Sequence, residues 1–190
     1  MMAGACVILA LINVRIAFGD IQRAPHIFFA CTALAIAGIS GFELALMRTT
    51  DLQRYESLLR LAVVPIFIMV ASVIGFIWSL FGTGRKWLAL LALIPNAAAQ
   101  IANLVSSVPA VRHAVALHQV RTFGGVWFTV PTIVNGPWDI VEMTSVAATV
   151  VFVADASITL WKKGGRRRAL IVGGSVVLFF LAARGHAIGR

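Results

Sequence analysis

Polar side chains that could do chemistry are few in this sequence, and most of them interrupt long apolar runs. The candidate site residues are Arg15, Glu43, Asn96, Gln100, Asn103 and Asp155. If these runs cross a bilayer, an ionisable side chain near its centre costs about 3 kcal/mol, so it needs a partner or a function such as proton or ligand binding. Amides at the same depth bridge helices or line a pocket.

Asp155 is the strongest of these candidates, because it lies inside an apolar run that ends at a tryptophan. On a helix, Thr144 and Thr159 fall close to its face and extend a polar stripe. We expect an ion pair with Arg15 or with Lys162, and Asp155→Asn should then lower the stability of the bundle. Proton or ligand sensing is the functional alternative.

Glu43 lies near the end of a run that has small residues on another face. We expect an interfacial ion pair with Arg48 or Arg60, and a ligand contact is the alternative. The small residues repeat every fourth position: Ala33, Ala37, Gly41 and Ala45. Because such a ribbon lets a neighbouring helix approach closely, this helix should be central in the bundle.

The three amides Asn96, Gln100 and Asn103 follow Pro95 at positions i, i+4 and i+7. This spacing puts them on one face of a kinked helix. That face should open towards the loop that follows. The side chains either bridge to a neighbouring helix or line a small pocket, and bridging is favoured.

Patterns typical of catalysis or metal binding are missing. There is no nucleophile elbow, no phosphate-binding loop, and no HExxH or CxxC motif, so we expect no enzymatic activity and no metal site. Cys6 and Cys31 fit small core residues. We predict no cofactor. Haem or pigment binding stays open, because His113 or His118 could pair with His186, although no spacing specifies it.

The composition indicates a polytopic membrane protein. Of the 190 residues, 60% are hydrophobic and only 12% are charged, and the mean hydropathy is +0.94. Soluble domains are about half apolar and a quarter charged. The net charge of +9 comes from short clusters between apolar runs, which lipid headgroups explain better than nucleic acid. The expected partners are the lipid bilayer and other membrane proteins or further copies of the chain, without nucleic acid.

The apolar runs predict an all-α bundle of about six spans in a single membrane domain. The predicted spans are residues 3–17, 26–47, 61–81, 87–105, 139–161 and 169–183. At about 1.5 Å per residue the first barely crosses about 30 Å of hydrocarbon. Residues 48–60 read as a charged, partly helical connector.

The long loop 106–137 differs from the other connections. Gly124-Gly125 and Asn135-Gly136 flank the β-prone run 126–130, which suggests a short hairpin outside the bilayer.

Positive charge predicts the orientation of the chain, because cytoplasmic loops are enriched in Lys and Arg. The densest short clusters are Arg85, Lys86, Lys162, Lys163, Arg166, Arg167 and Arg168. We expect them at the cytoplasmic face of a bacterial inner membrane. The N-terminus and the loop 106–137 are then extracytoplasmic.

Several segments resemble the N-terminal membrane module of a group of bacterial sensor histidine kinases. These segments are, in order, Phe42–Thr50 with Leu58–Pro65, Asn135–Trp138, and Val153–Trp161 continuing through Arg166–Ser175 to His186. The resemblance implies a module that passes a signal from its outer loop and helix bundle to a cytoplasmic kinase of a two-component system.

The chain departs from that family pattern at its end. It has no further span to return it to the cytoplasm, and it lacks dimerisation, phospho-accepting and ATP-binding segments. We therefore expect a fragment of a longer receptor or a free-standing relative. The alternative function is an accessory subunit that docks onto a larger respiratory or photosynthetic membrane complex. A transporter is a third possibility, but no inverted repeat supports it.

Overall fold

A computed structural model describes residues 2–19, 23–82, 85–106, 111–121, 125, 127–164 and 174. Within these residues the chain is mostly helical, with one small antiparallel sheet. The elements are α1 (Met2–Gly19), α2 (Arg23–Arg48), α3 (Leu52–Phe81), α4 (Lys86–Val105), β1 (Arg112–Arg121), β2 (Trp127–Asn135) and α5 (Asp139–Lys162).

The membrane character of the chain is confirmed by its helices. In the described part, α2, α3, α4 and α5 are long and apolar enough to cross a membrane, whereas α1 is a shorter apolar helix. Of the predicted span 169–183, the structure describes only residue 174, so this span is not tested. The structure therefore supports four candidate spans and does not support the count of six.

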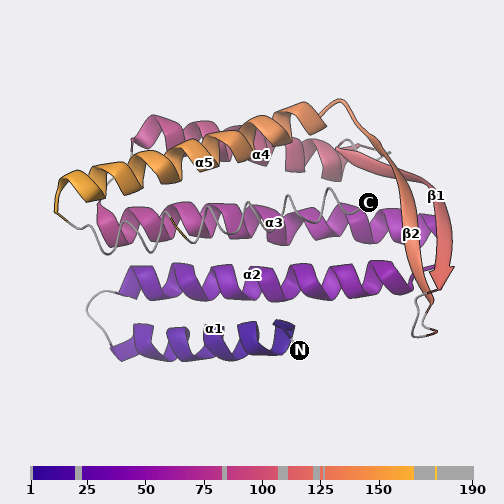
Figure 1. The fold of residues 1–190 in the computed structure, drawn as a ribbon, viewed down its shortest axis with the longest axis horizontal. Helices are drawn as coiled ribbons and strands as arrows, with labels where there is room; N and C mark the ends of the chain where they lie inside the picture. Colours follow the sequence, from indigo (N-terminus) through magenta and orange to yellow (C-terminus); the bar gives the residue numbers. More distant parts are fainter. Residues whose placement is uncertain are drawn as a thin grey trace.

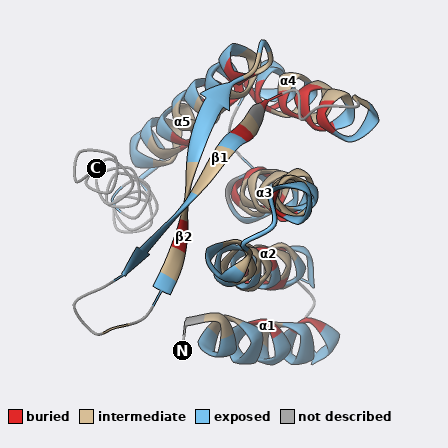
Figure 2. Cartoon of the chain, turned by 90° about the vertical axis from the view of Figure 1, so that its right-hand side faces the viewer, coloured by how far each residue is buried: buried red, intermediate tan, exposed pale blue. Residues whose placement is uncertain are grey.

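Three helices, α1, α2 and α3, form a row, and α4 and α5 form a pair at the α3 side of that row (Figure 1). α1 packs on α2, α2 packs on α3, and α4 packs on both α3 and α5. Viewed along their axes, α1, α2 and α3 lie in line, and α5 lies beside α4 (Figure 2). α2 lies between α1 and α3, but the most central helix is α3, because it contacts α2, α4, α5 and β1.

Small residues bring the neighbouring helices close, though not at all the positions expected. Ala33 packs with Ala30 and with Ala10 of α1, whereas Gly41 is exposed. The α2–α3 interface uses a different glycine, because a Cβ at Gly75 would lie only 2.5 Å from the Phe28 ring.

The main hydrophobic core lies between α3, α4 and α5. Its members are Ile74, Ile77, Leu88, Ala89, Ala92, Ala148, Phe152, Val153 and Ala156. Phe152 is the largest fully buried side chain of this cluster. Alanines surround it on α4 and α5, so the two helix backbones come close around one large ring.

The predicted hairpin in the loop 106–137 is confirmed, and it is longer than expected. β1 pairs antiparallel with β2 from Arg112↔Asn135 to Arg121↔Trp127, with an irregularity between Ala114 and Ala116. The sheet lies across one end of the bundle, where α2 meets α3 (Figure 1).

α3 extends well past the predicted span 61–81 and supports this sheet. Its 30 residues give a length of about 45 Å, against about 30 Å of hydrocarbon. Asp51 caps the helix by accepting from the backbone N–H groups of Gln53 and Arg54. The charged connector 48–60 is therefore mainly the first turns of α3, and β1 contacts this helix.

Candidate functional site

The amide face of α4 is buried inside the bundle. Asn96, Gln100 and Asn103 lie on the same side of the helix as Ala92 and Ala99, and all five residues are buried. Gln100 Nε2 lies 3.5 Å from Asn96 Oδ1, and Gln100 Oε1 is buried without a hydrogen-bond partner among the described residues. The sequence therefore predicted the shared face correctly, and the structure encloses it.

A serine on α5 continues this polar face and was missed by sequence reasoning. Ser145 is fully buried, and its Oγ donates a hydrogen bond to the Ala92 carbonyl of α4 over 2.5 Å. We call Asn96, Gln100, Asn103 and Ser145 the polar seam. Serines are common in membrane helices, so the sequence does not show that Ser145 bonds to another helix. This contact depends on how α5 packs on α4.

The polar seam offers hydrogen bonds but no charge. It has neutral amides and one hydroxyl, so it can bind a water molecule or a small polar group and can hold helices in register. An unpaired buried acceptor such as Gln100 Oε1 costs about 1–3 kcal/mol when nothing satisfies it. The seam is thus a polar interior that favours specific helix packing over loose association.

We expect Ser145→Ala to lower the free energy of unfolding by about 1 kcal/mol, because the bond to the Ala92 carbonyl is lost. Thr144→Ala is the matched control, since the exposed Thr144 hydroxyl donates to the Ile140 carbonyl of its own helix. Reversible unfolding in mixed micelles measures both variants. Equal losses would contradict an interhelical role for Ser145.

Asp155 forms its ion pair with a residue that the sequence did not indicate. Its Oδ1 lies 3.8 Å from Nε of Arg85, at the beginning of α4. The expected pairing with Arg15 is wrong, because Arg15 is exposed on α1, on the far side of α2 and α3 (Figure 2). Packing of α5 on α4 determines the partner, and Lys162 is not the cation in this contact.

We expect Asp155→Asn to lower the free energy of unfolding by no more than about 1 kcal/mol, because 67% of the Arg85 side chain and 26% of the Asp155 side chain are exposed. A double-mutant cycle with Arg85→Gln measures the coupling. A coupling well above this value would show that the pair is shielded from water in the membrane.

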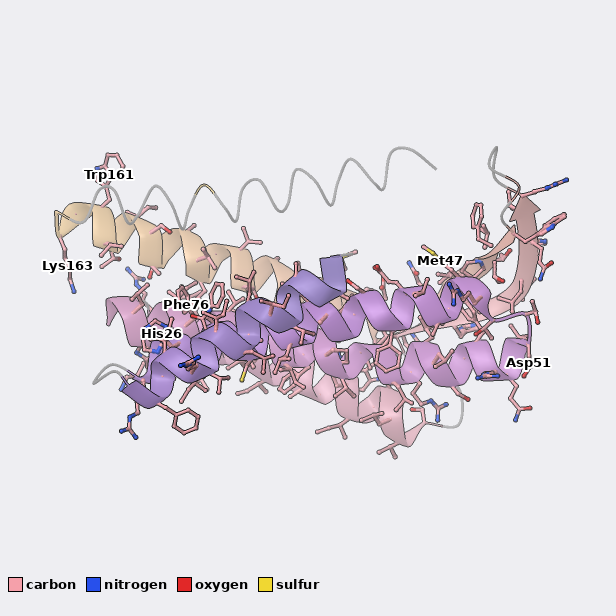
Figure 3. All side chains as sticks on the ribbon, turned by 90° about the horizontal axis from the view of Figure 1, so that it is seen from below. His26, Met47, Asp51, Phe76, Trp161 and Lys163 are labelled. Atoms are coloured by element: carbon pink, nitrogen blue, oxygen red, sulfur yellow. The ribbon has the colours of Figure 1, made fainter. Side chains whose placement is uncertain are left out.

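The remaining charged candidates lie at the ends of the helices. Glu43 is exposed near the end of α2, and its pairing with Arg48 or Arg60 stays a prediction. Lys163 lies at the end of the bundle opposite Asp51 (Figure 3). The clustered cations in the described part lie where α4 begins and α5 ends, at that end of the bundle: Arg85, Lys86, Lys162 and Lys163. Arg166, Arg167 and Arg168 lie outside the described residues.

A half-open cavity of about 300 Å³ occurs at the same end, between α1, α2 and α3. It is lined by Asn13, Pro25, His26, Phe29, Phe76 and Leu80. His26 and Phe76 lie close together there (Figure 3). Sequence reasoning did not connect these residues, because they come from three helices and only Pro25 and His26 are neighbours in the chain.

The lining of this cavity combines two polar side chains, Asn13 and His26, with two aromatic rings. His26 Nδ1 lies 3.2 Å from Asn13 Oδ1, and the rings of Phe29 and Phe76 are tilted with centroids 6.2 Å apart. The volume is at the lower end of the range for small-molecule sites. Such walls can hold the polar head of a small amphiphile whose apolar part remains in lipid.

The described residues contain no cluster of three or more His, Cys, Asp or Glu side chains that could hold a metal ion. His113 is half-buried on β1, and His118 Nε2 lies 3.2 Å from Thr132 Oγ1. A haem ligand pair with His186 stays untested, because His186 lies outside the described residues.

Comparison of the chain with known protein families, with characterised proteins and with solved structures finds no match.

Proposed function

We propose that this chain is a non-catalytic membrane module that receives a signal through its outer hairpin and helix bundle, like the sensing domain of a sensor histidine kinase. The supporting observation is the hydrogen bond between the hairpin and the connection of α2 with α3. Thr129 of β2 is buried, and its Oγ1 donates to the Thr49 carbonyl at the end of α2 over 2.8 Å.

This bond joins two parts of the bundle that are otherwise only moderately packed together. The hairpin lies between α4 and α5 in the chain, whereas Thr49 belongs to the α2–α3 connection. The interface of α3 with α4 and α5 is smaller than the α2–α3 interface. A ligand that binds two arrangements of these parts with different affinity would shift their equilibrium, which is what a sensor requires.

The cavity between α1, α2 and α3 is the proposed ligand site within the bundle. In the predicted orientation it lies at the cytoplasmic side of a bacterial inner membrane, and the hairpin lies outside. A small amphiphile could therefore act at one end of the helices while the hairpin receives a signal at the other.

Thermal unfolding of the purified protein in nanodiscs tests this function, with phospholipids, quinones and small amphiphiles added in turn. We expect one class to raise the unfolding temperature, because binding to the native state at 100 times Kd stabilises it by about 2.7 kcal/mol. His26→Leu should abolish the shift. His118→Leu, on the hairpin, is the matched control and should retain it. No shift with any class, and no association with a kinase, would contradict the proposal.

An accessory subunit of a larger membrane complex is the second candidate. Val120 and Val134 are exposed on the side of the hairpin opposite Thr129, where a partner protein could cover them. Native mass measurement after extraction in a mild detergent tests this function. Recovery of the free chain alone would count against it.

A further inference from the structure

The pairing register of the hairpin defines which side chains share a face. Residues directly opposite each other in an antiparallel pair point to the same side, and every second residue along a strand does so too. Gln119 pairs with Thr129 and Arg121 pairs with Trp127. Thr129, Trp127 and Arg121 therefore lie on one face of the hairpin.

This face is turned towards the ends of the helices. Thr129 is buried against the end of α2, where its hydroxyl bonds to the Thr49 carbonyl. Trp127 is the first residue of β2 and lies two residues before Thr129, which is about 7 Å at the rise of an extended strand. Trp127 thus continues the bundle-facing side beyond the point where the hairpin rests on a helix.

Beyond that point the hairpin extends past the helices. Figure 2 shows the strands running from α4 and α5 past α3 and α2, with the far end projecting clear of the helix row. Trp127 lies at this end and is 59% exposed, although its face is the one turned to the bundle. A large apolar ring at this end of the hairpin is therefore left mostly uncovered by the residues that the structure describes.

The chemistry of this end matches a lipid headgroup layer. Arg121 Cζ lies 5.9 Å from the centroid of the Trp127 ring, in a cation–π arrangement. Tryptophan concentrates at membrane interfaces because its ring is apolar and its N–H is polar, and arginine binds phosphate. Since α2 and α3 are candidate membrane spans, the surface beside their ends is the headgroup region of one leaflet.

We propose that the Arg121–Trp127 end of the hairpin is a lipid anchor, with the indole in the interfacial layer and the guanidinium on phospholipid phosphate. This contact would fix the hairpin at two places, on α2 through Thr129 and on the bilayer through Trp127. It does not depend on whether the module signals.

Fluorescence quenching in nanodiscs tests the anchor in the full chain, in a variant where Trp127 is the sole tryptophan. We expect bromolipids labelled near the headgroup to quench Trp127 strongly and aqueous iodide to quench it weakly. The matched control places the sole tryptophan on the opposite face, with Trp127→Phe and Thr132→Trp. The tryptophan at position 132 should be quenched strongly by aqueous iodide and weakly by the bromolipids.

Two outcomes would overturn the anchor. Strong quenching of Trp127 by iodide alone would place the ring in water, and protection from both quenchers would place it under a second copy or a partner protein. If removal of the other four tryptophans impairs folding, fluorotryptophan labelling of the native chain replaces the first measurement. The resonance that Trp127→Phe removes should then broaden with spin-labelled lipid and not with a soluble nitroxide.

Discussion

Replacing Phe152 with alanine should lower the free energy of unfolding by about 3 kcal/mol, at the lower end of the range for buried aromatic truncations. Only 1% of its surface is exposed, and it packs between α3, α4 and α5. Unfolded spans stay in lipid, so little is lost from transfer to water. The loss comes mainly from the cavity and the missing van der Waals contacts.

Ile158→Ala on the same helix is the control for this prediction. Ile158 is 56% exposed and would face lipid, so its truncation should change stability by less than about 0.5 kcal/mol. Unfolding in mixed micelles measures both variants. A similar loss in the two would mean that α5 does not pack through Phe152 in the membrane.

Gly75→Ala should destabilise the α2–α3 pair by about 1–3 kcal/mol, even though alanine favours helix formation. The added Cβ would lie 2.5 Å from Cε1 of the Phe28 ring, and two further ring atoms lie at 2.7 Å. The helices must separate or the ring must leave its rotamer, since three atoms of one rigid ring lie this close.

Two further variants make this prediction specific. Gly41→Ala on α2 meets no atom within 4 Å, so it should be neutral or should stabilise by up to about 1 kcal/mol. Phe28→Leu combined with Gly75→Ala should recover most of the loss. Without this recovery, the steric explanation would fail.

Much of the helical architecture could be predicted from the sequence, because long apolar runs and short polar turns determine which segments span a bilayer. The amide face of α4 was also predictable, since it depends only on helical spacing. Neither the enclosure of that face nor the hydrogen bond from Ser145 could be predicted, because both depend on which helix packs against α4.

The partner of Asp155 was predicted wrongly and β1 was not predicted as a strand, for related reasons. Arg15 is equally plausible in sequence, and only the order of helices in space excludes it. β1 was not expected as a strand, although Gly124-Gly125 lies between it and β2. Its run from His113 to Gln119 becomes a strand because β2 and the first turns of α3 offer it partners. Tertiary contacts determine its conformation more than local propensity does.

The position of the hairpin between α4 and α5 also has a consequence for biogenesis. The bond from Thr129 to Thr49 joins residues 80 positions apart, so it can form only after α2 and α3 are in the membrane and β2 has been synthesised. Both strands must lie on the same side of the bilayer before they pair. During synthesis, the buried amides of α4 are made before Ser145 and the rest of α5 that cover them. Assembly of α4 with α5 is therefore a late step, and until it occurs these amides lack the cover that α5 gives them.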